Sequence, residues 1–542
     1  MNQRQFLSVC LSVWMFTVGF AAAADQKGTL VVALETLGGQ TMDPILEGRA
    51  PHAHYQAPVF DALVGYDYEK GGIGPGVAER WELGPDGQSW TFFLQKGLKW
   101  HNGDPLTAHD VKFSLERTMS KDSLASRATA LRRNVKSIDV IDDHTVRVNT
   151  KGVQVHFPAS LSRAVFQEGQ LMPKKYIESV GVEEFRKNPV GSGPWKFVES
   201  VPGDYVEYEA VDHDHWRGKP SYKRLRILLI PEESTRVAMV RTGEAAIASI
   251  SPESISEAKA AKLKVISVPA TMQAIYQFWG AWREDQKDNP VSNPKVREAL
   301  SLAIDRQAII EHVMYGEASW PMPFATFGYS SDMSQNRWRA WSKEALRYDP
   351  KRAKELLAEA GYPDGFELKF ANTALPGTPY MTQIGIAIAD FWTKIGVDVK
   401  LKNYEWGAFR LLYRGDQKKL SGGVSMYRTA GRPMAAARYS VFASRKEGHN
   451  LFGSSAECPD SCKAFDALYR TVVSEKDDTK RQANTDKMIE SVADSWIAVP
   501  VLEGKGYWAI NPDKVGAFKP IPGRHEFGDV FERMPRPEQK AW

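Results

Sequence analysis

The stretch from Trp90 to Met119 constrains the fold more than any other part of the sequence. It reads WTFFLQKGLKWHNGDPLTAHDVKFSLERTM. Large residues alternate at its start, a pattern typical of a half-buried strand, and Gly97 ends that strand. Asn102-Gly103 is a strong signal for a hairpin turn. Apolar residues then recur at helical spacing, at Val111, Leu115 and Met119. The stretch predicts a packed strand–turn–helix unit with a structural role.

Short strands and helices alternate along most of the remaining chain. Strands are predicted where β-branched or alternating residues gather, at 28–33, 145–148, 205–210 and 225–230. Helix starts are marked by Thr107 with Asp110 three residues on, by Asn293-Pro294 and by Asp349-Pro350, whose helix should end at Gly361. Strands that alternate with helices favour an α/β architecture with mixed sheets.

The first 24 residues read as a cleavable signal peptide. Arg4 is the only charge before Asp25, Phe6 to Phe20 is apolar, and small residues follow at 21–24. The apolar run is short for a membrane span, which needs about 20 residues, although an uncleaved anchor is the alternative. Val9 before Cys10 argues against a lipid anchor there. We expect an exported, periplasmic protein.

Charge and cysteine content fit that compartment. Without Arg4 the net charge of +4 becomes +3, spread over many residues of both signs, which gives no case for nucleic-acid binding. Once Cys10 is removed, Cys458 and Cys462 are the cysteines that remain. An even number in an oxidising compartment favours a disulfide between them. Two free thiols are the alternative.

The opening stretch closely resembles the signature of family 5 extracellular solute-binding proteins, the oligopeptide/dipeptide/nickel-binding type of ABC importers. The matching residues are Gly97, Trp100, His101, Asn102, Gly103, Pro105, Thr107, Ala108, Asp110, Val111, Phe113, Ser114, Leu115 and Arg117. Further blocks follow in the order of the family, among them NPVGSGPWKF (188–197), HWRGKP (215–220), NPKVREALSLAIDRQAII (293–310) and IADFWTKIGVDVKLKNYEW (388–406). The resemblance covers essentially the whole mature chain.

The resemblance implies a bilobal periplasmic-binding-protein fold of the class II type with an extra inserted domain and two hinge crossings. Lobe I would comprise residues 25–66, 193–278 and 501–542, the inserted second domain residues 67–192, and lobe II residues 279–500. The lobes would close over a solute. The closed monomer would then dock on an inner-membrane permease pair driven by a cytoplasmic ATPase.

Enzyme motifs find little support in the sequence. There is no GxSxG or HExxH, and GGIGPG at 71–76 lacks the dinucleotide-binding spacing. The pairs His52/His54 and His213/His215 could each face one metal ion, but two ligands are too few. We therefore expect no catalytic residues, no metal and no cofactor. A secreted hydrolase is the rival from another class.

The nature of the solute is suggested by one departure from the family pattern. Peptide-binding members hold the amino group of the ligand with an aspartate about 20 residues after an E-W pair, here Glu405-Trp406. The corresponding segment, 425–442, has no acidic residue and carries Arg428, Arg432 and Arg438 instead. Arginine favours a carboxylate or phosphate, so we expect a solute with an anionic group near Arg428 or Arg432. The alternative is that these arginines are solvated. Within the binding class, the candidate solutes are a conventional peptide with a different amine anchor, a carboxylated sugar or opine-like compound, and a metal chelate.

Aromatic residues and a glycine loop complete the predicted site. Trp279, Trp282, Trp406 and Tyr427 fall where the lobes of the family face each other or nearby, and their rings could stack on a sugar, an aromatic ring or a peptide plane. Core packing is the alternative for each tryptophan. The loop TLGGQT at 36–41 resembles the family loop that lines one wall of the cleft, where Gly38 and Gly39 would let backbone groups approach the solute.

Overall fold

The computed structural model describes most of the chain. The described residues are 28–46, 53–69, 72–125, 128–162, 169–281, 283–375, 378, 380–414, 417–430, 434–439, 460–521, 527–528 and 530–539. The predicted signal peptide at 1–24 lies outside them. No helix among the described residues combines the length and apolar character needed to cross a membrane.

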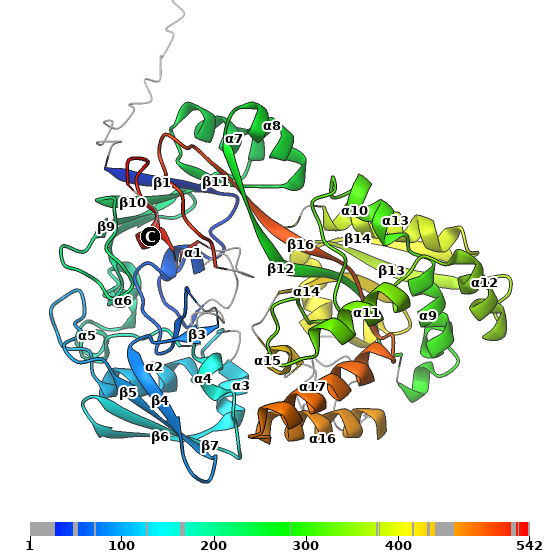
Figure 1. Ribbon diagram of the computed structural model, residues 1–542, viewed down its shortest axis with the longest axis horizontal. Coiled ribbons are helices and arrows are strands. Elements are labelled where there is room, and N and C mark those ends of the chain that lie inside the picture. Colours follow the sequence, from blue (N-terminus) through cyan, green and yellow to red (C-terminus); the bar gives the residue numbers. More distant parts are fainter. Residues whose placement is uncertain are drawn as a thin grey trace, which may run out of the picture.

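A mixed sheet of ten strands runs through the molecule (Figure 1). Its strands lie in the order β14 (Asp398–Glu405), β13 (Glu367–Ala374), β15 (Val424–Ala430), β12 (Lys264–Phe278), β16 (Ala498–Ile510), β11 (Ile247–Ile250), β1 (Thr29–Leu34), β10 (Arg224–Leu229), β9 (Tyr205–Ala210) and β8 (Trp195–Val201). Parallel pairs involve β1 with β10 and β11, and β13 with β14 and β15. The other pairs are antiparallel, so the prediction of an α/β protein with mixed sheets is confirmed.

Two long strands, β12 and β16, belong to both halves of this sheet. Residues 264–268 of β12 pair with 506–510 of β16 in one half, and 272–277 pair with 498–504 in the other. The register shifts between Val268 and Met272. Figure 1 shows the two strands passing from the half that contains β1 to the half that contains β13. They form the two predicted crossings.

Helices cover each half of the sheet. In the half around β1 they are α1 (Ala53–Gln56), α7 (Glu233–Thr242) and α8 (Ile255–Ala260). In the half around β13 they are α9 (Pro294–Leu302), α10 (Arg306–His312), α11 (Gln335–Ala345), α12 (Pro350–Glu359), α13 (Met381–Thr393), α14 (Trp406–Arg414), α15 (Ala435–Tyr439), α16 (Asp460–Ser474) and α17 (Asp478–Ala493). The predicted starts are confirmed, because the side chains of Asn293 and Asp349 accept the N–H groups of Lys295 and Arg352.

The stretch from Trp90 to Met119 lies in a separate small unit. Its sheet has the order β4 (Ala78–Leu83), β5 (Ser89–Leu94), β7 (Thr145–Thr150) and β6 (Val135–Asp142). The helices beside it are α2 (Ala108–Thr118), α3 (Ala128–Asn134), α4 (Phe157–Ser160), α5 (Lys174–Val180) and α6 (Val182–Lys187). Just before β4 in the sequence, β2 (Gly65–Tyr66) pairs with β3 (Ile73–Gly74). The hairpin expected at Asn102-Gly103 is reduced to one bridge between Lys99 and Pro105. β5 pairs instead with β4 and β7, because its buried face completes their core.

Two blocks of the family signature pack against each other. The ring of His101 contacts the carbonyl of Gly193 through Nε2 at 2.8 Å, and burial lowers the pKa of His101 to about 4. A Cβ atom on Gly191 would lie 2.0 Å from the carbonyl oxygen of Val59, and one on Gly193 would lie 2.3 Å from that of Pro58. The sequence GSGPW is therefore glycine-rich because the chain passes close to a neighbouring backbone.

A buried carboxyl group lies on β16 where the halves meet. Glu503 is 6% exposed, and its Oε1 accepts the N–H of Met322 at 2.9 Å. Burial raises the pKa of Glu503 to about 7, more than the nearby charge of Arg339 lowers it. The folded chain therefore holds this proton to higher pH than the unfolded chain does.

We predict that Glu503 makes the stability of the protein depend on pH. The free energy of unfolding should fall as the pH rises from 4.5, the ordinary pKa of Glu, towards about 7, because the folded state must then bury a charge. Glu503→Gln keeps the acceptor for Met322 and removes the titration. Urea unfolding should show similar stability for the two proteins at pH 5, and a wild type less stable by at most about 3 kcal/mol at pH 8.

Glu284→Gln is the matched control, because the side chain of Glu284 is 88% exposed. That variant should follow the wild-type profile. If the free energy of unfolding depended on pH in the same way in the wild type and in Glu503→Gln, Glu503 would not be the group that causes this dependence.

Candidate functional site

Three polar side chains come together near the crossing of β12 and β16. Arg428 lies on β15, opposite Ala274 of β12, and is half-buried. Tyr380 lies immediately before α13, and Glu35 lies immediately after β1. Burial raises the pKa values of both Tyr380 and Glu35, and the charge of Arg428 opposes that rise in each. The group therefore draws residues from both halves of the large sheet.

Glu35 is the acidic member of this group. Burial raises the pKa of Glu35, and the positive charges of Arg236 and Arg428 only partly oppose that effect. Arg236 is buried, and its guanidinium donates to the carbonyl groups of Ile230, Pro231 and Ser249 at 2.8–2.9 Å. The backbone thus fixes Arg236 beside Glu35, and the carboxyl group is held near two positive charges.

Tyr380 supplies a phenol group to the same place. Burial raises the pKa of Tyr380 to about 12, so the group stays protonated and can donate a hydrogen bond. A Cβ atom at Gly504 of β16 would lie 2.7 Å from the Sδ of Met272 and 3.4 Å from the Tyr380 hydroxyl. The glycine lets Tyr380 lie directly against the crossing strand.

The aromatic residues predicted for the site form a different cluster. Trp406, at the start of α14, lies 6.1 Å from Tyr427 between ring centroids, with the rings 34° apart. Trp279 packs beside both, and its Nε1 donates to the Oγ of Ser425 at 2.9 Å. Trp279 is 8% exposed, whereas Trp406 and Tyr427 are half-buried. The three rings do come together.

The aromatic cluster and Arg428 lie on opposite faces of β15. Successive residues of a strand point to opposite faces of the sheet, and Tyr427 and Arg428 are successive. Arg428 and the predicted aromatic residues therefore do not line one common surface.

The glycine loop after β1 is held at both ends. Gly38 has φ +59°, which favours glycine, and Gly39 is exposed. The side chain of Gln40 donates to the carbonyl groups of Val201 and Tyr205 at 2.7 and 3.1 Å. The loop is thereby fixed on the turn between β8 and β9. Glu35 directly precedes this loop in the sequence, so its backbone position is fixed as well.

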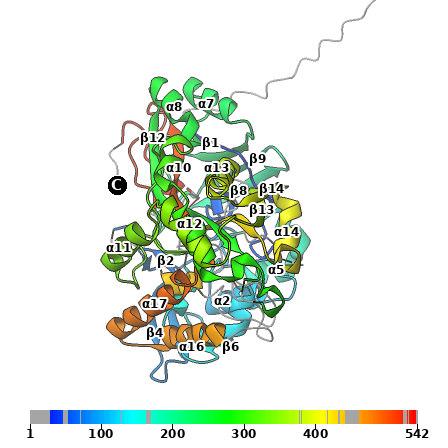
Figure 2. The same ribbon diagram turned by 90° about the vertical axis from the view of Figure 1, so that its right-hand side faces the viewer.

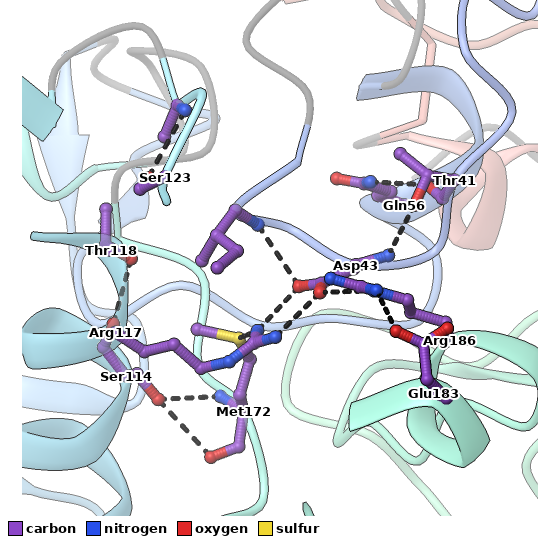
Figure 3. A network of polar contacts seen from close by, with 12 residues as sticks. Thr41, Asp43, Gln56, Ser114, Arg117, Thr118, Ser123, Met172, Glu183 and Arg186 are labelled. Carbon is purple, nitrogen blue, oxygen red and sulfur yellow. Dashed lines mark hydrogen bonds and ion pairs between the residues drawn. The ribbon is translucent and has the colours of Figure 1, made fainter. Parts of the chain in front are cut away.

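The other end of the loop is fixed by Asp43, a fully buried carboxylate (Figure 3). Arg117 of α2 donates to both of its oxygens at 2.5 and 2.6 Å, and Arg186 of α6 donates to Oδ2 at 3.2 Å. Figure 3 shows Arg117 and Arg186 approaching the carboxylate from different helices, with Glu183 beside Arg186. This network joins the loop to the small unit.

Several predicted residues lie outside the described part of the chain. They are Trp282, Arg432 and Cys458, together with the side chain of Cys462 and with His52. The disulfide and the role of Arg432 stay predictions.

The structure separates His213 from His215. His215 is buried, with its Nε2 at 2.8 Å from the carbonyl of Ser192, whereas the side chain of His213 is 63% exposed. His54 accepts the N–H of Phe527 through Nδ1. Among the described residues, no three or more His, Cys, Asp or Glu side chains are arranged to hold a metal ion.

Glu35 and Tyr380 were not among the residues predicted for the site. Glu35 directly precedes the predicted loop, so its proximity to that loop was a usable signal. Nothing in the sequence near Tyr380 indicates its contact with β16, because that contact depends on how α13 packs on the sheet.

The chain is similar to solute-binding proteins in both sequence and structure. The profile of the bacterial extracellular solute-binding proteins, family 5 Middle, matches residues 72–445. Heme-binding protein A of Haemophilus influenzae is 28% identical over 502 residues, which cover 86% of this chain and 85% of that protein. The periplasmic oligopeptide-binding protein OppA of the same organism is 30% identical over 393 residues, 68% of this chain and 70% of that protein. The crystal structure of the ABC transporter substrate-binding protein CtaP of Listeria monocytogenes matches with a TM-score of 0.76 at 21% identity, over 94% of this chain and 99% of that one.

We predict that Asp43→Asn destabilises the protein strongly. The substitution leaves the guanidinium groups of Arg117 and Arg186 around a neutral side chain. Removing one partner of a buried ion pair typically costs about 3–5 kcal/mol of stability. Equilibrium unfolding in urea measures this loss.

The control is Glu183→Gln, which also removes a partner of Arg186 but at a side chain that is 79% exposed. It should cost less than about 1 kcal/mol. If Asp43→Asn and Glu183→Gln lowered the free energy of unfolding equally, the burial of Asp43 would not be what makes its ion pairs stabilising.

Proposed function

The chain belongs to the bacterial extracellular solute-binding proteins of family 5, and from this premise we propose that its solute carries an anionic group which Arg428 binds. Proteins of this family are the substrate-binding components of ABC importers. One observation carries the proposal: Arg428 lies near the crossing strands, within electrostatic reach of Glu35 from the other half of the sheet. The segment 425–442 offers no acidic residue to an ammonium group.

The chemistry of Arg428 and its neighbours supports an anion. A guanidinium group binds a carboxylate or phosphate through two parallel N–H···O bonds, and the protonated Tyr380 hydroxyl is a further donor. Burial raises the pKa of Glu35, and a protonated Glu35 would donate a hydrogen bond to an anion where the charged form would repel it. A buried ammonium beside Arg428 without an acidic partner would cost several kcal/mol.

Closure of two lobes is the proposed mode of capture. Lobe I would comprise residues 25–66, 193–278 and 501–542, with 67–192 as the inserted domain and 279–500 as lobe II. The shift of register between Val268 and Met272 supports a hinge at that point of β12, since fewer ladder hydrogen bonds resist bending there. Glu35 and Arg428 would then approach each other as the lobes close.

Delivery follows from the role of the family. We propose that the closed monomer releases its solute, chemically unchanged, to an inner-membrane permease pair coupled to a cytoplasmic ATPase, and that the chain works in the periplasm. A secreted hydrolase would convert its substrate, so turnover distinguishes the two functions.

A conventional peptide is the second candidate, and Glu35 is the observation that favours it. A carboxylate beside Arg428 could hold the amino group of a di- or oligopeptide while Arg428 holds its carboxylate. The oligopeptide-binding relative supports this class of solute. Glu35 would then be the amine anchor that segment 425–442 lacks.

Thermal unfolding of the mature protein with two panels of solutes tests the proposal. One panel holds di- to pentapeptides, and the other holds carboxylated sugars, opines and aromatic acids. At about a hundred times its dissociation constant a solute stabilises the folded state by roughly 2.7 kcal/mol. We expect stabilisation by members of the second panel and loss of that stabilisation in Arg428→Ala.

Two variants serve as controls. Arg352→Ala removes an arginine that is 38% exposed on α12 and should leave the stabilisation unchanged. Glu35→Gln should keep it for an anionic solute and lose it for a peptide held by its amine. Full stabilisation of Arg428→Ala by the same acid would refute the proposed anchor.

A further inference from the structure

A second contact joins the two sides of the molecule far from the crossing strands. The N–H of Val155, which lies between β7 and α4, donates to the carbonyl of Val473 in α16 at 3.0 Å. Lys476, in the turn between α16 and α17, donates to the carbonyl of Pro85 at 3.2 Å. Figures 1 and 2 show α16 and α17 beside the small sheet, at the end of the molecule away from the crossing of β12 and β16.

The contact is closely packed. A Cβ atom at Gly87 would lie 2.9 Å from the Cε of Lys476 and 3.2 Å from a methyl carbon of Val153, and Gly87 has φ +73°. The turn between β4 and β5, the segment 153–156 and the turn 473–478 therefore meet at one point. A larger residue at position 87 would displace the end of the Lys476 side chain.

His156 lies within this contact. Its Nε2 is buried and has no hydrogen-bond partner among the described residues. Burial and the positive charge of Arg481 lower the pKa of His156 to about 3, against a smaller opposite effect of Asp478. The imidazole is therefore neutral while the contact is closed.

The charged groups that act on His156, Arg481 and Asp478, lie on α17, on the opposite side of the contact. Arg481 of α17 is held by the carbonyl groups of Glu475 and Lys476 and by the carboxylate of Asp478. Lys476 is engaged with Pro85, and Asp86 accepts the N–H of Gln88 within its own turn. The segment 152–160, which carries His156, contains no charged residue. Among the described residues, Asp478 is the carboxylate that acts on His156, and its effect on the pKa is smaller than those of burial and Arg481.

We propose that the segment 153–156 and the turn 473–481 form a latch that holds the lobes closed, and that closing the latch requires His156 to be neutral. The latch rests on the proposed capture by lobe closure, since the lobes cannot open about β12 and β16 without separating Val155 from Val473. Opening exposes His156 to water and lets it take up a proton. Acidification therefore favours the open state, and with it release of the solute.

Single-residue hydrogen exchange at the Val155 amide measures the latch directly. We use the mature protein without added solute and correct for the intrinsic exchange rate at each pH. An exposed imidazole titrates near pH 6.5, so the protection factor should fall about tenfold from about pH 7.5 to about pH 5.5. In His156→Gln the protection factor should not change over this range.

The control is His213→Gln, which removes a histidine whose side chain is 63% exposed. This variant should keep the tenfold change, and the amides of β5 should report that all three proteins remain folded. The same pH dependence in His156→Gln would overturn the role of His156. An unprotected Val155 amide at both pH values, or protection equal to that of β5 at both, would overturn the latch.

Failure of the proposed anionic anchor would leave this outcome unchanged. The exchange of Val155 is measured without any solute and does not involve Arg428. The two proposals can therefore fail separately.

Discussion

The pairing of β12 with β16 is the constraint on which the rest of the structure depends. These two strands supply backbone hydrogen bonds to both halves of the large sheet, so the halves are joined by a ladder whose register shifts between Val268 and Met272 and again between Ala274 and Ile275. Strand register then decides which side chains meet. Glu503, Gly504 and Met272 lie at the crossing, and Arg428 is placed through its pairing with β12.

The charged and polar groups near the crossing come from both halves of the sheet. Arg428 and Tyr380 come from the half around β13, whereas Glu35 and Arg236 come from the half around β1. Any change in the angle between the halves therefore changes the separation of Glu35 from Arg428. The aromatic cluster of Trp279, Trp406 and Tyr427 lies on the other face of β15, so stacking and charge recognition would involve different surfaces of that strand.

Local features of the fold could be predicted from the sequence, and features set by distant contacts could not. The caps at Asn293 and Asp349 depend on neighbouring residues and are readable directly. The hairpin at Asn102-Gly103 was expected from local turn chemistry, but β5 pairs with β4 and β7, because these strands share its core. The neighbours of Arg428 depend on which strands pair and in what register, so Glu35 and Tyr380 appear only in the folded chain.

The central claim is that the chain captures a solute with an anionic group at Arg428. Mass spectrometry of the small molecules released from the purified mature protein tests it most directly, because it identifies the solute that the protein carries. The account predicts a compound that carries a carboxylate or phosphate and is not an ordinary peptide, and that is missing from Arg428→Ala purified in the same way. Ordinary peptides with a free amino terminus, released equally from both proteins, would contradict it.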